Sequence, residues 1–237
     1  MSSSETGYAK NAANFKDLII QLKNLEGDYQ PPKPSLNIEA LEAISIKSEE
    51  LMRTLSQLAP IYNQCVDKQE LIFSTQNNLV TRSYNYLKVV VDNPGDLETI
   101  KTIADKIRGV NKKTDPVEEG KTNHSQSQTS YDNKLENFKR YIDALQNTKV
   151  YLPLESDIKL ETFNDLAVKM GEALTAVALS KSPVDVARKN RYNFFYADKT
   201  GLVDIANDIK TYSRAVLKKD HQLYKAIQDI KFNKISH

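Results

Sequence analysis

The chain has 237 residues, of which 40% are hydrophobic and 27% charged, with 33 lysines and arginines against 31 aspartates and glutamates. These values are ordinary for a soluble protein with a core, and a net charge of +2 excludes a strong overall attraction to nucleic acid or to a membrane surface. The single cysteine excludes an internal disulfide and a cysteine-based zinc site within one chain.

The first residues carry no apolar signal segment, and no run approaches the roughly 18 apolar residues that span a bilayer. We therefore expect a cytoplasmic protein that does not contact a membrane. Only 7 glycines and 8 prolines accompany many charged, long side chains, a balance that favours helices over sheets.

The first predicted helix contains NFKDLIIQLKN at 14–24, and a similar segment, NFKRYIDALQN, occupies 137–147. The alignment continues through the connections and the following helices, placing Glu39 over Glu161 and Pro60 over Pro183. A duplicated module of about 123 residues is therefore predicted.

Apolar residues three or four apart predict a long second helix from Ile38 and its counterpart from Leu160. Proline is favoured at the first position of a helix, so Pro60 and Pro183 are each predicted to start a new helix, with Ser182 as a cap. A turn at 93–96 is predicted to lead into the closing helix of the first half, capped by Asp96.

Residues 110–130 contain two valines as their only apolar residues, which predicts a polar, flexible linker. The expected domains are a first helical repeat unit at 1–109 and a second at 131–237. Each would hold about four helices, so the predicted fold is all-α, with two tandem, internally duplicated helical bundles or one elongated bundle.

Residues 198–201 read Asp-Lys-Thr-Gly, the tetrapeptide around the phosphorylated aspartate of P-type ion pumps. That chemistry also needs an aspartate at a strand end, Mg²⁺ ligands and a phosphate-binding loop, which no other segment suggests. The predicted repeat aligns Gly201 with Asn78, and both residue types readily adopt the left-handed conformation that ends helices. We therefore predict a joint between two helices, and not a phosphate acceptor at Asp198.

No pattern indicates a catalytic residue, a cofactor site or a metal site, so none is predicted. The histidines, His124, His221 and His237, lack the spacing to other ligands that zinc or di-iron sites use.

One segment could bind nucleic acid, because Arg188, Lys189, Arg191 and Tyr192 interleave basic and aromatic side chains. Such residues can stack on bases while neutralising phosphates. The aligned segment of the first half has Leu71, Ile72 and Phe73 just after this position, which favours core packing for the aromatic residues instead.

The second half resembles a group of bacterial helical proteins with no established activity. The matching elements are Arg191-Tyr192-Asn193-Phe194-Phe195-Tyr196, Thr200-Gly201-Leu202-Val203-Asp204, Lys210-Thr211-Tyr212 and Tyr224-Lys225 followed by Ile230-Lys231-Phe232. The match covers residues 158–232 and departs at 217–221, where a Gly/Ser-Pro linker would be expected. The resemblance implies a helical fold and assigns no function.

We therefore expect a non-enzymatic helical interaction or scaffold protein that binds a protein partner or assembles with itself, without a small-molecule ligand. The alternative from a different class is a nucleic-acid-binding protein that uses its basic and aromatic second half. An enzyme with a site between the two halves is a third hypothesis.

Overall fold

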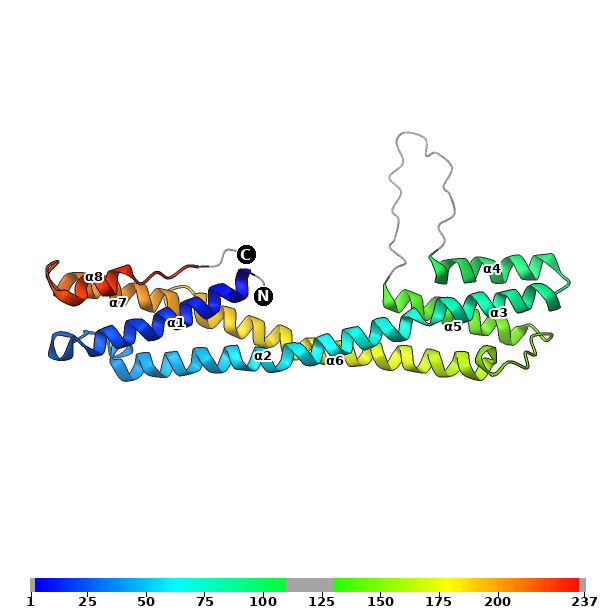
Figure 1. Ribbon diagram of the computed structural model, residues 1–237, viewed down its shortest axis with the longest axis horizontal. Helices are drawn as coiled ribbons and strands as arrows, with labels where there is room; N and C mark the ends of the chain where they lie inside the picture. The colour runs from blue at the N-terminus through cyan, green and yellow to red at the C-terminus, as the bar shows by residue number, and fades with distance from the viewer. Residues whose placement is uncertain (1–2, 110–129, 235–237) are drawn as a thin grey trace, which may run out of the picture. The chain divides into compact units, whose positions relative to one another are not determined.

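The computed structural model describes residues 3–109 and 130–234, and every regular element in these ranges is a helix, which confirms the all-α class. Labelled as in Figure 1, the α-helices are α1 (Ser3–Lys23), α2 (Ile38–Ser74), α3 (Gln76–Val90), α4 (Pro94–Arg108), α5 (Tyr131–Asn147), α6 (Leu160–Tyr196), α7 (Leu202–Val216) and α8 (Gln222–Asp229). Within the described ranges, none of the helices combines the length and apolar character that crossing a bilayer requires.

The chain divides into two compact units that are not the two halves of the sequence. Unit 1 contains Met1–Pro60 and Ser182–His237, whereas unit 2 contains Ile61–Lys181. The sequence analysis instead expected domains at 1–109 and 131–237, each with its own core. The difference arises because α2 and α6 each continue across a unit boundary, so each long helix supplies residues to both units.

The two prolines lie inside helices, so the prediction that each starts a new helix was wrong. Both α2 and α6 have 37 residues and run through Pro60 and Pro183 without interruption. A proline inside a helix removes one backbone hydrogen bond. Both prolines are exposed, so water can reach the carbonyl that loses its partner. Ser182 is consequently an interior helical residue and not a cap.

The core of unit 1 joins the two ends of the chain. Phe15, Leu18 and Leu22, spaced three or four apart on α1, are at most 1% exposed. They belong to the same buried cluster as Phe195 at the end of α6 and Ile227 on α8. The periodic face of α1 is thus buried by residues about 180 to 210 positions away in the sequence.

The core of unit 2 is built by the end of α2, by α3, α4 and α5, and by the first part of α6. Phe138 on α5 stacks on Phe163 of α6 with ring centroids 5.7 Å apart, and both are fully buried. Tyr141 is also fully buried, and its hydroxyl lies 2.8 Å from Ser83 Oγ on α3. The hydrogen bond gives both buried hydroxyl groups a partner, and a buried polar group without a partner would destabilise the fold.

The connections before α2 and α6 contain the same buried tyrosine hydrogen bond. Tyr29 Oη donates to the Leu36 carbonyl at 2.8 Å, and Tyr151 Oη donates to the Ile158 carbonyl. In both places the acceptor lies in a short 3-10 helix, Pro34–Leu36 or Ser156–Ile158. Each half of the sequence contains four α-helices, α1–α4 in the first and α5–α8 in the second, among the residues that the structure describes. The duplication itself stays a prediction.

Removing the Tyr151 hydroxyl is expected to lower the free energy of unfolding by about 1–2 kcal/mol, because the Ile158 carbonyl loses its buried hydrogen-bond donor. Tyr151→Phe would be compared with Tyr86→Phe by urea unfolding. The Tyr86 ring packs on Tyr151 with centroids 5.5 Å apart, and no hydrogen bond joins its hydroxyl to the described residues. Equal losses in the two variants would contradict the role given to the Tyr151 hydroxyl.

Two helix starts show how local side chains set helix boundaries. Asn93 caps α4, accepting from the Gly95 N–H at 3.0 Å, so the prediction of Asp96 as the cap was wrong. Pro94 takes the first helical position, and Asp96 follows inside the first turn. Ser130 Oγ caps α5 by accepting from the Asn133 N–H at 3.3 Å. The rest of the predicted linker, 110–129, lies outside the described residues.

Candidate interaction surface

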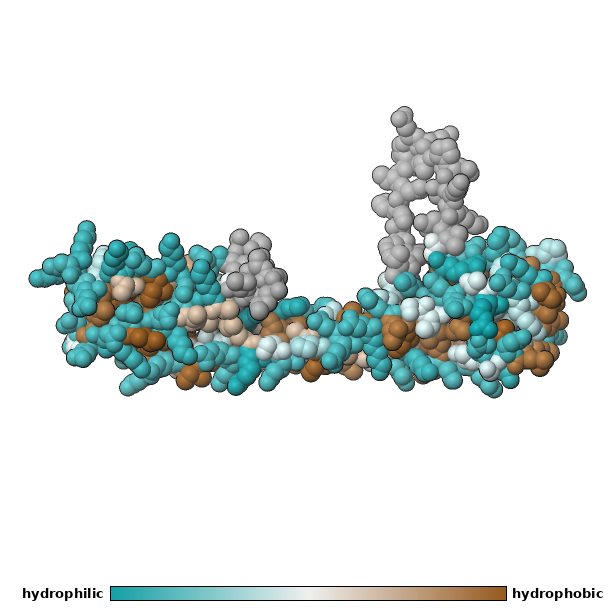
Figure 2. Space-filling view, viewed as in Figure 1, coloured by the Kyte–Doolittle hydropathy of each residue, from teal (hydrophilic) through white to brown (hydrophobic). Residues whose placement is uncertain are grey.

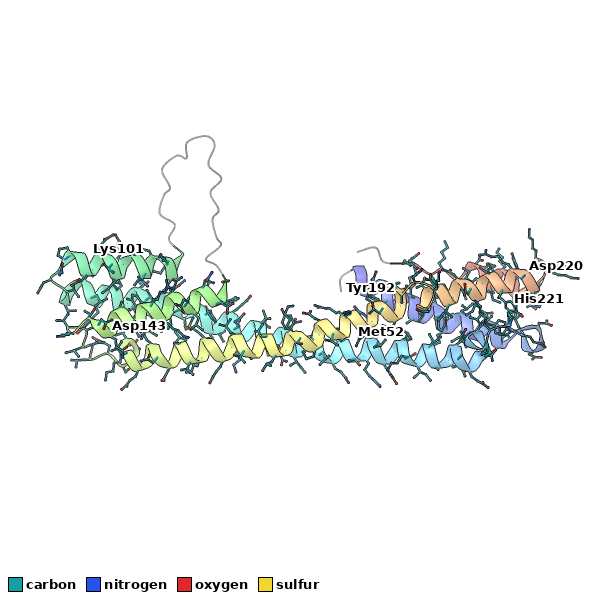
Figure 3. The ribbon with its side chains drawn as sticks, turned by 180° about the vertical axis from the view of Figure 1, so that it is seen from behind. Met52, Lys101, Asp143, Tyr192, Asp220 and His221 are labelled. Atoms are coloured by element: carbon teal, nitrogen blue, oxygen red, sulfur yellow. The ribbon has the colours of Figure 1, made fainter. Side chains whose placement is uncertain are left out.

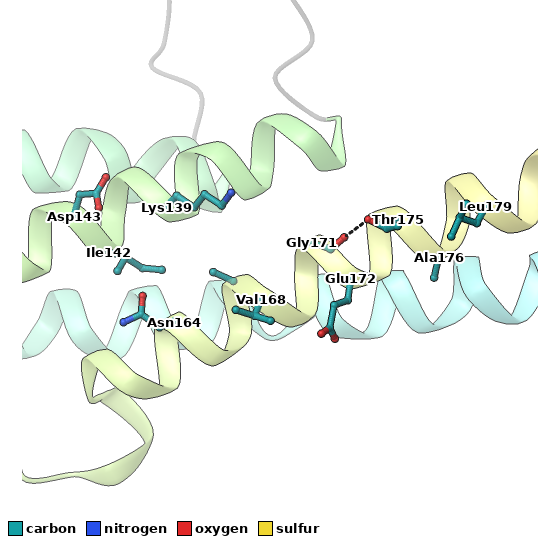
Figure 4. A pocket seen from close by; sticks show the side chains of 11 residues that line it. Lys139, Ile142, Asp143, Asn164, Val168, Gly171, Glu172, Thr175, Ala176 and Leu179 are labelled. Atoms are coloured by element: carbon teal, nitrogen blue, oxygen red, sulfur yellow. Dashed lines mark hydrogen bonds between the residues drawn. The ribbon is translucent and has the colours of Figure 1, made fainter.

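Unit 2 has an open hollow between α5 and α6 with a volume of about 920 Å³ (Figure 4). We call it the α5–α6 groove. The lining residues from α5 are Lys139, Ile142 and Asp143, and those from α6 are Asn164, Ala167, Val168, Gly171, Glu172, Thr175, Ala176 and Leu179. Because the α6 residues recur every three or four positions, they line one face of that helix.

The floor of the groove is apolar and partly open to solvent. The exposed fraction is 60% for Val168 and 70% for Leu179, high values for large aliphatic side chains on one helix face. Between them the lining face carries the small residues Gly171 and Ala176 together with the polar residues Glu172 and Thr175. The groove therefore has an exposed aliphatic residue at Val168 and at Leu179, with small and polar residues between them.

Packing does not require a glycine at position 171. A Cβ built there would meet Leu135 Cδ2 at 3.9 Å, an ordinary van der Waals distance. Glycine in a helix interior costs about 1 kcal/mol relative to alanine. The packing of α5 on α6 would therefore tolerate an alanine at position 171, where the glycine lines the groove.

The matching surface of unit 1 is bridged by two ion pairs between α1 and α2. Lys16 Nζ lies 3.2 Å from Glu49 Oε1, and Lys23 Nζ lies 2.5 Å from Glu42 Oε1. All four side chains are substantially exposed, so each pair contributes at most about 1 kcal/mol. Both ion pairs join α1 to α2, so their side chains lie across the surface between these helices, where a further helix would have to pack.

Unit 2 lacks these bridges. The predicted repeat aligns Glu42 with Asn164 and Glu49 with Gly171, so neither carboxylate has a counterpart on α6. Lys139, the counterpart of Lys16, forms no ion pair within the described residues. Where α1 and α2 are bridged by Glu42 and Glu49, the positions that the predicted repeat aligns with them carry an amide and a glycine.

Three charged side chains line the groove: Lys139, Asp143 and Glu172. None of them is in an ion pair with the part of the chain that the structure describes. In Figure 4, Lys139 and Asp143 extend from α5, while Glu172 extends from α6 away from both. The groove thus offers one ammonium and two carboxylates to an occupant.

A second apolar surface lies at the end of unit 2 formed by the α3–α4 and α5–α6 connections (Figure 2). The α5–α6 connection carries the large aliphatic residues Val150, Leu152 and Leu154, with exposed fractions from 49% to 91%, and Val89 near the end of α3 is 83% exposed. The residues that the predicted repeat aligns with the three connection residues are Asp28, Gln30 and Pro32, so the matching connection in unit 1 carries no large aliphatic residues at these positions. The buried tyrosine hydrogen bond is common to both connections, and the apolar surface is not.

The residues proposed for nucleic-acid binding do not form one surface. Arg191 is 5% exposed, and its guanidinium lies over the Tyr8 ring, 3.9 Å from the centroid. Tyr192 is half-buried against the core of unit 1. Only Arg188 and Lys189 are exposed, and Arg188 lies 3.7 Å from the Asp185 carboxylate. A buried arginine that stacks on a tyrosine is not available to a phosphate, which weakens the nucleic-acid alternative.

The Asp-Lys-Thr-Gly segment is a joint between helices, as predicted. The joint runs from the end of α6 at Tyr196 to the start of α7 at Leu202, and Asp198 is exposed within it. The Lys199 N–H donates to Asp204 Oδ2 at 2.9 Å, and Lys234 Nζ lies 2.9 Å from Asp204 Oδ1. The Lys234 ammonium lowers the pKa of the Asp204 carboxyl.

The predicted reason for Gly201 was wrong. Gly201 has φ −70°, and the left-handed residue of the joint is Lys199, with φ 62°. Asn78, the aligned residue, lies inside α3 and not at a joint. Glycine is needed for close approach, because a Cβ at position 201 would lie 2.7 to 2.8 Å from backbone atoms of Ala197 and Phe195.

His221 has a structural role at the turn between α7 and α8 (Figure 3). Its Nδ1 accepts from the Leu223 N–H at 3.1 Å, which caps α8, and its Nε2 lies 3.9 Å from Asp28 Oδ2. Across the described ranges no three histidine, cysteine, aspartate or glutamate side chains gather as metal ligands would. His124 and His237 lie outside those ranges.

Comparison with known proteins finds no match to this chain among family models, curated proteins or solved structures. The function must therefore be argued from the surfaces described above.

Sequence reasoning missed the groove, although one signal was present. Within the predicted repeat, Glu49 aligns with Gly171, an exchange of a charged residue for a helix-weakening one in the middle of a long helix. The sequence alone does not connect this exchange with a groove, because the ion pair between Glu49 and Lys16 is visible only in the structure.

Proposed function

We propose that this protein is a non-enzymatic interaction or scaffold protein that binds a helix of another polypeptide in the α5–α6 groove. The observation that carries the proposal is the groove itself, which is apolar, about 920 Å³ in volume and lined along one face of α6. Amphipathic helices bind such grooves through apolar residues spaced three or four apart.

The length of the groove suits this mode of binding. The lining residues of α6 extend from Asn164 to Leu179, which corresponds to about 22 Å of helix. A helix of about four turns would cover Val168 and Leu179 at the two ends. Burying exposed aliphatic side chains is the main favourable term in such association.

We also infer that the two halves of the chain descend from one helical module, and that binding was kept or acquired by one copy. The equal lengths of α2 and α6 and the shared tyrosine hydrogen bonds support this inference. In this view unit 1 is a closed version of the same surface, in which Lys16 and Glu49 occupy the path of a bound helix.

A photo-cross-linking amino acid at position 168 is expected to form adducts with a bound protein in cells. Position 46 is a matched control, because Ile46 is 59% exposed, Val168 is 60% exposed, and the predicted repeat aligns the two. Adducts at 168 without adducts at 46 would support binding in the α5–α6 groove. Equal labelling at both positions, or none at either, would contradict the proposal.

A further inference from the structure

We propose that unit 1 contains a binding site for an extended segment of another protein, and that the chain's own residues 230–234 occupy this site as an intramolecular inhibitor. We call residues 230–234 the C-terminal segment. The site is formed by α1 and α7 of unit 1, so the proposal does not depend on the α5–α6 groove of unit 2. The expected ligand carries an aromatic residue followed two positions later by a lysine or arginine, as Phe232 and Lys234 do here.

Two asparagines on one face of α1 hold the backbone of the C-terminal segment. The Asn11 side chain donates to the Asn233 carbonyl at 2.8 Å and accepts from the Asn233 N–H at 3.2 Å. One turn further along α1, Asn14 Nδ2 donates to the Lys231 carbonyl at 2.7 Å. The segment therefore runs antiparallel to α1, and Figure 1 shows it as an extended trace after α8. Such main-chain hydrogen bonds bind an extended peptide with little dependence on its side chains.

Asn11 occupies a position on α1 where an apolar residue is expected. It is 2% exposed and lies between Tyr8 and Phe15 on the periodic buried face of the helix. A buried amide destabilises the fold unless it is hydrogen-bonded, so an asparagine suits the recognition of a backbone here better than it suits packing. Its Nδ2 also donates to the Tyr196 hydroxyl at 3.2 Å. That bond does not involve the C-terminal segment, so the amide stays oriented when the segment leaves.

Two side chains of the C-terminal segment give the site its selectivity. The Phe232 ring packs against the edge of Phe15, with centroids 6.5 Å apart. Lys234 Nζ lies 2.9 Å from Asp204 Oδ1 on α7. Side chains two positions apart point to the same side of an extended backbone, whereas the residues on either side of Phe232 are exposed. The site therefore selects an aromatic residue and a basic residue with any residue between them.

The C-terminal segment is not required to close a core of this kind. The predicted repeat aligns Ile230 with Ile107, which lies inside the 15-residue helix α4 of unit 2. In unit 1 the corresponding helix, α8, has only 8 residues, and Ile230 follows it in extended conformation. No residue of the segment is fully buried. A terminal segment with so few buried side chains can detach while the rest of unit 1 stays folded.

The test is the binding of a fluorescein-labelled peptide, Asp-Ile-Lys-Phe-Asn-Lys, to the full-length chain, measured by anisotropy. The paired change Phe232→Ala and Lys234→Ala weakens the tethered segment and leaves the site intact. This segment variant is expected to bind the peptide at least about tenfold more tightly than the wild type, because the tethered segment no longer competes.

A change in the site itself is the matched control. Asn11→Asp, added to the segment variant, should abolish binding, because a carboxylate cannot donate to the peptide carbonyl. The aspartate can still accept from the Tyr196 hydroxyl, so circular dichroism should show an unchanged fold. A peptide with alanine in place of phenylalanine should bind the segment variant at least about tenfold more weakly.

Equal affinity of the wild type and the segment variant would overturn the proposal, as would a folded segment variant that binds no peptide. Hydrogen exchange of the wild type tests the same idea without any substitution. The Asn233 amide is expected to exchange at least about 100-fold faster than the amide of Leu18 in the core. Equal rates would make the segment an inseparable part of the fold and overturn the proposal. A wild-type dimer that the segment variant converts to a monomer would assign the site to a second copy's C-terminal segment, which would also overturn it.

Discussion

Replacing Gly201 with alanine is expected to lower the free energy of unfolding of unit 1 by about 3 kcal/mol. The added Cβ would lie 2.7 to 2.8 Å from the backbone N and O of Ala197 and the carbonyl of Phe195. These are backbone atoms of Phe195, in the last turn of α6, and of Ala197, which follows the helix directly, so they cannot rotate away as a side chain would. Guanidinium unfolding followed by circular dichroism would measure the loss.

Gly27→Ala is the matched control for this prediction. No heavy atom lies within 4 Å of a Cβ built at Gly27, and the residue does not have a positive φ. Its stability is expected to stay within about 0.5 kcal/mol of the wild type. If Gly201→Ala and Gly27→Ala unfolded at the same denaturant concentration, the close approach at the α6–α7 joint would not constrain the fold.

Above about pH 10 the free energy of unfolding is expected to fall as the pH rises. Burial raises the pKa of Tyr29, Tyr141, Tyr151 and Tyr196, in the cases of Tyr141 and Tyr196 to about 12. In the unfolded chain a tyrosine loses its proton near pH 10. Between about pH 10 and 12 the unfolded chain therefore binds fewer protons than the folded chain, and rising pH favours unfolding.

The expected slope is up to about 1.4 kcal/mol per pH unit for each buried tyrosine that stays protonated. Urea unfolding at a series of pH values, with tyrosinate absorbance as a second signal, would measure it. Tyr141→Phe removes one of the four groups and should make the slope shallower, even though it also loses the hydrogen bond to Ser83. A stability that is constant from pH 10 to 11 would contradict the prediction.

The helical class could be predicted because it depends on local spacing. Phe15 and Phe138, aligned from the sequence as buried residues, are both fully buried. The position of the prolines was predicted wrongly, because proline is common at the first position of a helix. Here long helix-forming segments on both sides of each proline keep the helix continuous. Pro60 and Pro183 are exposed, so solvent reduces the cost of interrupting the hydrogen bonds of α2 and α6.

The candidate site depends on long-range contacts that no local pattern encodes. Arg191 is one example, because its burial requires Tyr8, which lies more than 180 positions earlier in the chain. Gly171 is another, because Leu135, which lies near it, and Lys139, which lines the same groove, come from a different helix. Sequence alignment of the two halves located the unusual residue, and only the packing of α5 on α6 shows that a groove results.

The sharing of α2 and α6 between the two compact units has a consequence for any attempt to divide this protein. A protease that cut within 110–129 would divide the chain into two polypeptides. Neither would carry a whole core, because unit 1 needs Phe15 with Phe195 and unit 2 needs Phe73 with Phe138. The two pieces would stay associated, because each compact unit contains segments of both. Neither half of the sequence is therefore expected to fold when it is expressed alone, whereas the two halves expressed together are expected to associate and fold.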